Sequence, residues 1–172
     1  MPRYVALLRS VNVGGRKVPM SELRAVFEEL GYTGVRTYIQ SGNVVFDAKS
    51  GTPARIRSLI ESELRSEFGM EITVLLRTPA ELGKIVKRNP FDKNAYVTFL
   101  DKAPAPRLVQ ALDPASFAPD EFVVDGNEVF VRCPNGYGRT KINNTFFERK
   151  LATKATTRNW NTVALLHEWA MG

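Results

Sequence analysis

The segment VRTYIQSGNVVFD, residues 35–47, decides the fold of the first half of this chain. Two runs rich in valine and aromatic residues, 35–40 and 43–47, flank the dipeptide Ser41-Gly42. β-Branched and aromatic residues favour strands, and a short polar pair containing glycine between two such runs is typical of a turn. The segment therefore predicts two strands joined by a hairpin.

A predicted helix lies on each side of this hairpin. Before it, apolar residues recur at i, i+3, i+4 and i+7 between Pro19 and Gly31, the spacing of an amphipathic helix. After it, Thr52 and Pro53 combine a capping residue with a proline at the first helical position, and Gly69 ends the apolar stripe. Both segments are therefore predicted to be helices.

Strands at residues 4–9 and 71–77 complete the pattern at its two ends. The resulting order within the first 77 residues is β-α-β-β-α-β, which is the split-βαβ, ferredoxin-like arrangement. We expect an antiparallel sheet with both helices on one face.

The second half predicts a smaller α+β region without a marked linker. The expected elements are a capping-box helix from Thr78, a strand at 95–100, a helix from Pro104 to about Leu112, a hairpin of strands 122–125 and 128–132, a helix at 145–151 with a second capping box at Thr145 and Glu148, and a final helix at 159–170. We expect domain limits at 1–77 and 78–172. The sequence contains no internal repeat at a fixed period.

Composition excludes several classes of protein. The chain has 172 residues, of which 44% are hydrophobic and 24% charged, an ordinary globular balance. One cysteine, Cys133, and one histidine, His167, cannot supply a usual zinc site or a disulfide framework. We expect a cytoplasmic protein in a reducing compartment, with no signal peptide, membrane span, cofactor or metal.

The net charge of +6 is confined to one block, residues 132–160. Seven basic residues lie there against Glu148 alone, so the rest of the chain is neutral overall. Clustered cations indicate an anionic partner. A solvated basic face is the alternative.

Three stretches resemble an uncharacterised bacterial family known as domain of unknown function 1697. They are LLRSVNVGG (7–15), TYIQSGNVVF (37–46) and ATTRNWNTV (155–163). The resemblance covers nearly the full chain. It implies a ferredoxin-like half followed by a smaller α+β half, and it implies no activity and no catalytic residues.

Two loops of the first half contain candidate ligand-binding residues. The first follows the opening strand and contains Arg9, Asn12, Gly14 and Gly15, where glycines allow a ligand close to the backbone. The second contains Gln40, Ser41 and Asn43. In a split-βαβ sheet the first and third strands are neighbours, which brings the two loops into one region. Tight turns with no ligand are the alternative for both.

Two stretches of the basic block contain the other candidates. Arg139 and Lys141 lie in a glycine loop that enters a helix, where they would bind phosphate. Thr156, Thr157, Arg158 and Asn159 precede the last helix, where hydroxyls, a guanidinium and free N–H groups would favour an anion. Plain helix capping by Asn143, Asn144 or a threonine is the alternative.

Catalytic groups are sparse. His167 lies inside the last predicted helix, and Cys133 is expected to be a small buried residue. The basic block, residues 132–160, contains no paired carboxylates. Whether the protein is an enzyme therefore stays open.

Three functions fit these observations. The first is binding of a phosphate-bearing small ligand, such as a nucleotide, at a basic, amide-rich site between the two halves. The second is a nucleic-acid-binding module that uses the C-terminal basic block, although the strand at 43–47 lacks the aromatic signature of RNA-recognition domains. The third is a structural or interaction protein without a ligand. The oligomeric state stays open.

Overall fold

The computed structural model describes residues 1–9, 17–38 and 42–172. Two compact units form, one from Met1–Gly83 with Leu166–Gly172 and one from Lys84–Leu165. We refer to them as unit 1 and unit 2. The domain limits expected from the sequence, 1–77 and 78–172, stay a prediction that limited proteolysis would test.

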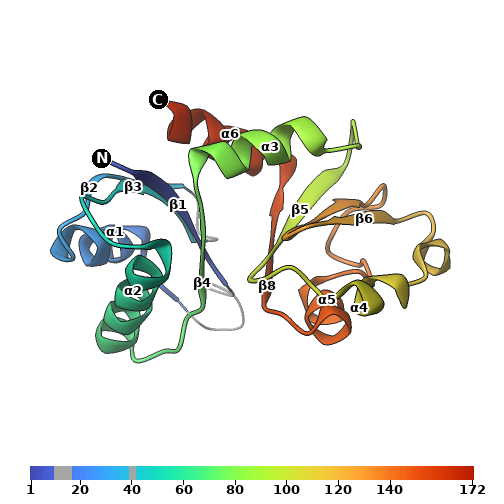
Figure 1. The fold of residues 1–172 in the computed structure, drawn as a ribbon, viewed down its shortest axis with the longest axis horizontal. Helices are drawn as coiled ribbons and strands as arrows, with labels where there is room; N and C mark the ends of the chain where they lie inside the picture. The colour runs from blue at the N-terminus through green and yellow to red at the C-terminus, as the bar shows by residue number, and fades with distance from the viewer. Residues whose placement is uncertain (10–16, 39–41) are drawn as a thin grey trace. The chain divides into compact units, whose positions relative to one another are not determined.

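Unit 1 has the predicted β-α-β-β-α-β order (Figure 1). Its elements are β1 (Arg3–Leu8), α1 (Met20–Glu29), β2 (Thr33–Tyr38), β3 (Asn43–Asp47), α2 (Pro53–Phe68) and β4 (Val74–Arg77). All strand pairs are antiparallel and the sheet order is β2-β3-β1-β4. The α+β fold class and the ferredoxin-like first half are therefore confirmed.

Unit 2 contains a second four-stranded antiparallel sheet. The elements after β4 are α3 (Pro79–Arg88), β5 (Ala95–Leu100), α4 (Pro106–Gln110), a 3-10 turn η1 (Pro114–Phe117), β6 (Glu121–Asp125), β7 (Glu128–Arg132), α5 (Asn144–Leu151), β8 (Ala155–Asn159) and α6 (Trp160–Met171). The sheet order is β6-β7-β5-β8. The predicted hairpin and the two C-terminal helices are present.

Strand β8 is a correction to the sequence prediction. Residues 156–159 were expected to form the approach to the last helix, with free backbone N–H groups. Instead Ala155–Asn159 pairs along its length with β5, from Leu100 opposite Ala155 to Tyr96 opposite Asn159. Thr156 and Thr157 are β-branched, which suits a strand. Their backbone therefore belongs to a sheet ladder rather than to a helix N-terminus.

With β8 in place, unit 2 repeats the order of unit 1, and the two sheets have corresponding strand orders. Side chains repeat as well. Glu61 of α2 accepts a hydrogen bond from the N–H of Val74, the first residue of β4, at 2.8 Å. Glu148 of α5 accepts one from the N–H of Ala155, the first residue of β8, also at 2.8 Å.

The last strands carry a second shared feature. Arg77 and Arg158 are both buried, each opposite a valine of the central strand, and each guanidinium donates to the carbonyl of the preceding residue at 3.0 Å. The chain therefore folds as two copies of one framework, which differ in their connections.

Each sheet packs one face against two helices (Figure 1). In unit 1 the aromatic rings of Phe27, Tyr32 and Phe46 meet at centroid distances of 4.9–6.4 Å under α1 and α2. In unit 2 Phe122, Phe146 and Phe147 form the corresponding cluster under α4 and α5. Burial of large aromatic side chains is a main source of stability in each unit.

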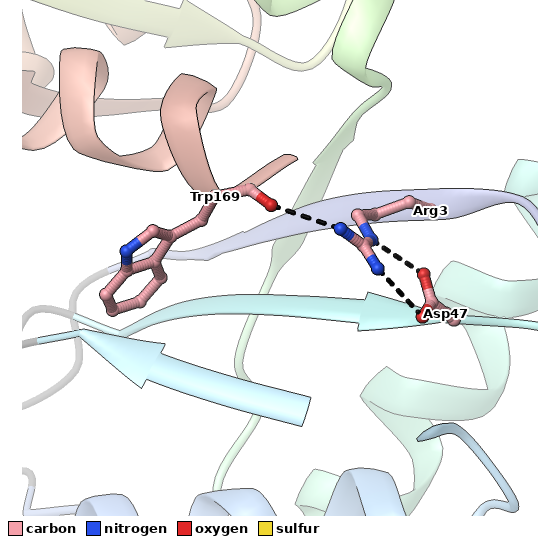
Figure 2. Close-up of polar contacts among 3 residues, drawn as sticks. All are labelled: Arg3, Asp47 and Trp169. Atoms are coloured by element: carbon pink, nitrogen blue, oxygen red, sulfur yellow. Dashed lines mark hydrogen bonds and ion pairs between the residues drawn. The ribbon is translucent and has the colours of Figure 1, made fainter. Parts of the chain in front are cut away.

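The last turn of α6 is part of unit 1 and packs against the sheet of that unit. Figure 2 shows the guanidinium of Arg3, which donates to both carboxylate oxygens of Asp47, at 2.8 and 3.2 Å, and to the Trp169 carbonyl at 3.2 Å. The bond with Asp47 raises the pKa of Arg3. Arg36 of β2 stacks over the Trp169 ring at 3.8 Å, and the Tyr38 ring meets the indole edge-on. The bond from Arg3 pairs a carbonyl at the helix end that has no hydrogen-bond partner within the helix. Arg36 and Tyr38 cover the indole ring.

Two helix caps follow the sequence and two do not, since α6 is capped by Asn159 rather than by a threonine. Thr52 accepts from the N–H of Arg55, and the capping box of Thr78 and Glu81 forms in both directions, at 2.8 and 3.2 Å. The second capping box, expected at Thr145 and Glu148, was wrong. Asn143 caps α5 by accepting from the N–H of Phe146 at 3.0 Å, and Glu148 is instead bonded to Ala155.

Substitutions at the start of α5 test this assignment. Asn143→Ala removes the capping acceptor and should lower the free energy of unfolding by about 1 kcal/mol. Thr145→Ala, inside the helix, should change it by no more than about 0.5 kcal/mol. Urea denaturation followed by circular dichroism measures both free energies. A larger loss for Thr145→Ala than for Asn143→Ala would instead support a capping box at Thr145 and Glu148.

Candidate functional site

A polar pocket lies within unit 2, with a cavity of about 530 Å³. Its lining residues come from two connections, α4–β6 and β7–α5. They are Ser116, Phe117, Ala118, Pro119 and Asp120 from the first, and Asn135, Gly136, Arg139, Thr140 and Lys141 from the second. The volume is within the range of small-molecule sites. Two candidate residues from the sequence, Arg139 and Lys141, lie in it.

Both connections are longer in unit 2 than their counterparts in unit 1. The α4–β6 connection runs over residues 111–120, whereas α1 and β2 are joined by residues 30–32. The β7–α5 connection runs over 133–143, whereas β3 and α2 are joined by 48–52. The pocket is therefore built from segments that the shared framework does not require. Connecting loops on a rigid framework are where binding residues concentrate.

A short hydrogen bond joins the two connections. The Thr140 hydroxyl donates to Oδ2 of Asp120 at 2.6 Å, and the Thr140 oxygen accepts from the N–H of Ile142 at 3.2 Å. Thr140 is buried, while its neighbours Arg139 and Lys141 are exposed. The inward side chain thus fixes the loop, and the two cations on either side of it reach the cavity.

A partly buried hydroxyl network holds the same loop against the sheet. Thr157 of β8 has one hydroxyl proton, which it donates to Oδ1 of Asn144 at 2.6 Å. Its oxygen therefore accepts from the hydroxyls of Tyr137, at 3.1 Å, and of Thr98 on β5, at 2.8 Å. Burial raises the pKa of Tyr137, which keeps its phenol protonated as a donor. Thr157 thus positions the pocket loop through Tyr137.

Two further features shape the loop. Gly136 has a φ of +91°, a conformation that residues with a Cβ rarely adopt. Cys133, at the start of the connection, is 1% exposed, and burial raises the pKa of its thiol. The expectation that Cys133 is a small buried residue is therefore confirmed.

The candidates in β8 have structural partners. Arg158 is 6% exposed and donates to the Thr156 hydroxyl at 2.7 Å and to the Thr157 carbonyl at 3.0 Å. Burial lowers its pKa to about 10, so the guanidinium stays charged at neutral pH. Asn159 caps α6 by accepting from the N–H of Thr162 at 2.8 Å. The pocket is lined by none of the four β8 candidates, Thr156, Thr157, Arg158 and Asn159.

Of the candidates in unit 1, Arg9 and Asn43 lie among the described residues. Asn43 is buried and donates from its amide to the Tyr38 carbonyl at 3.0 Å, which closes the β2–β3 hairpin. The backbone N–H of Arg9 donates to the Thr73 carbonyl. β1 pairs with β3 as expected, with Leu7 opposite Asn43. Asn12, Gly14, Gly15, Gln40 and Ser41 lie outside the described residues, and their roles stay predictions.

The sequence identified two of the ten lining residues of the pocket, Arg139 and Lys141. Ser116, Phe117, Pro119 and Asp120 were not singled out, although the segment DPASFAPD between a helix and a strand is unusually long and rich in turn residues. Loop length was the available signal for both connections.

A second polar cavity, of about 760 Å³, lies within unit 1. Its arginines are engaged: Arg3 with Asp47, Arg24 with Glu28 at 3.5 Å, and Arg36 over Trp169. Carboxylates of Glu29, Glu63 and Glu67 also cluster in unit 1; Glu29 and Glu67 are exposed and Glu63 is half-buried, and exposed acidic clusters are common without an ion. The pocket of unit 2 is therefore the stronger candidate.

These features place the chain among α+β proteins built from two successive split-βαβ units, the second of which carries a polar loop pocket. Within that class, residues 1–130 match the family described as a protein of unknown function, DUF1697. The chain belongs to this family, as the sequence resemblance indicated.

A solved structure shares the whole fold. The conserved bacterial protein SP0830 from Streptococcus pneumoniae is similar with a TM-score of 0.76 and 21% identity, over 100% of this chain and 99% of that one. The likeness thus extends past the family match to β7, α5, β8 and α6. No curated protein matches the chain. Among the described residues, no helix is long and apolar enough to cross a membrane.

Loss of the Thr157 hydroxyl should loosen the pocket loop. Thr157→Val leaves the Tyr137 and Thr98 hydroxyls without their acceptor in a partly buried setting, which costs about 1–2 kcal/mol. We expect faster hydrogen exchange of the amides in residues 133–143. Tyr137→Phe removes one bond only and should cost less than Thr157→Val. Equal costs, or unchanged exchange in the loop, would contradict the positioning role.

Proposed function

We propose that this protein binds a phosphate-bearing small ligand in the pocket formed by residues 116–120 and 135–141. The observation that carries the proposal is that these two segments are extensions of the shared framework and meet in one cavity. The proposed site lies in unit 2 alone, whereas the hypothesis from the sequence placed the ligand site between the two halves.

Charge supports a phosphate as the ligand group. Arg139 and Lys141 come from alternate positions of one loop and line the same cavity. A guanidinium binds phosphate as a fork and an ammonium binds it as a point charge, and hydrogen bonds between charged groups are the strong ones. Asn135 adds amide donors to the same wall. The loop therefore offers the donors that a phosphate group requires.

The β8 candidates take supporting roles in this proposal. Thr157 acts through Tyr137, and Arg158 and Asn159 act on the sheet and on α6. No catalytic step is proposed, and the reducing cytoplasmic setting expected from the single cysteine stays a prediction.

Burial and pairing weaken the nucleic-acid alternative. Of the seven cations in residues 132–160, Arg158 is buried and Arg132 forms an ion pair with Glu121 at 2.8 Å. A backbone-binding track needs cations exposed in series. The exposed Arg149, Lys150 and Lys154 belong to the end of α5 and its exit.

Binding of AMP, a phosphate monoester, tests the proposal by isothermal titration calorimetry. Arg139→Ala and Lys141→Ala should each weaken AMP binding by about tenfold or more, the value of one charge-assisted hydrogen bond. Arg149→Ala and Lys150→Ala, which remove exposed cations outside the pocket, are the matched controls and should leave affinity unchanged.

Two results would contradict the proposal. One is AMP binding that survives both pocket substitutions, and the other is an absence of saturable binding. Equal losses from all four substitutions, with tighter binding of a single-stranded oligonucleotide that weakens steeply with salt, would favour the nucleic-acid alternative.

A further inference from the structure

We propose that the ligand carries a vicinal diol beside its phosphate, as phosphorylated sugars and nucleotides do, and that Asp120 binds this diol. The inference rests on the proposed function and adds a class of ligand to it.

Asp120 is the acidic side chain among the lining residues of the cavity. It comes from the α4–β6 connection, and its carboxylate is bonded to Thr140, which lies between Arg139 and Lys141 in the other connection. A carboxylate repels a phosphate, so the phosphate group of a ligand would not itself bind Asp120. Its presence among the lining residues indicates that another part of the ligand meets Asp120.

The contacts of Asp120 leave its charge available to a ligand. Thr140 donates one hydrogen bond to Oδ2. Within the described residues, no ion pair shorter than 4.0 Å joins Asp120 to Arg139 or Lys141. An ionised carboxylate has two acceptor oxygens with about four lone-pair sites, and one bond from Thr140 does not fill them.

Adjacent hydroxyl groups are the partners that fit such an acceptor. Two neighbouring hydroxyls donate in parallel to the two oxygens of one carboxylate and bring no charge that would compete with the cations. The half-buried position of Asp120 excludes part of the water that would otherwise satisfy it. The cavity therefore offers two cations for a phosphate and one carboxylate for a diol.

A purely structural role for Asp120 is the competing explanation, because its bond to Thr140 joins the two connections. Asp120→Asn separates the two roles. The asparagine oxygen still accepts from Thr140, while the negative charge and one acceptor are lost. Thr140→Val does the opposite, since it breaks the bond between the connections and keeps the carboxylate.

Calorimetric titration with AMP and with 2′,3′-dideoxy-AMP, which lacks the ribose diol, tests the inference. The native protein should bind AMP about tenfold or more tightly than the dideoxy analogue. Asp120→Asn should weaken AMP binding and strengthen dideoxy-AMP binding, because the repulsion of the phosphate is removed. Arg139→Ala and Thr140→Val should weaken both ligands by the same factor and keep the preference.

Three results would overturn the inference without touching the proposed function. They are equal affinity of the native protein for the two nucleotides, an unchanged preference in Asp120→Asn, and loss of the preference in Thr140→Val. If neither nucleotide binds to the native protein, the proposed function fails and the inference fails with it.

Discussion

The pairing of β8 with β5 is the constraint on which the rest of unit 2 depends. It places Thr157 beside Thr98, so that the two hydroxyls meet at 2.8 Å and Thr157 can accept from Tyr137. Tyr137 lies between the two parts of the loop that line the pocket. The same strand sets Ala155 against Glu148 and Asn159 at the start of α6. Sheet, helix ends and pocket loop are therefore fixed together.

Local signals were sufficient for the β-α-β-β-α-β order of unit 1. Proline, glycine and capping residues mark the ends of α1 and α2, and the apolar periodicities in between differ clearly from those of the strands. In unit 2 the same reasoning located β5, the β6–β7 hairpin and α5, and it missed β8. The segment ATTRN contains one fully apolar residue, so its strand character comes from pairing with β5 rather than from composition. Threonine and asparagine occur both at helix caps and in edge strands. Only the pairing with β5 therefore shows that this segment is a strand.

The duplication was invisible in the sequence for a related reason. Equivalent positions such as Glu61 and Glu148 are held by bonds to the backbone, and such bonds leave neighbouring residues free to vary. The connections also differ in length, so no fixed period exists. Two of the ten lining residues were predictable, because Arg139 and Lys141 are cations in a glycine loop. Asp120 was not, since it is distant in sequence and only the fold brings it to Thr140.

Amide chemical shifts of the ¹⁵N-labelled protein during titration with AMP test the central claim, that the two extended connections of unit 2 form one phosphate-ligand site. We predict saturable shifts that are largest in residues 116–120 and 135–141, from both connections at a single dissociation constant. The largest shifts in residues 149–154, or shifts in one connection alone, would contradict it.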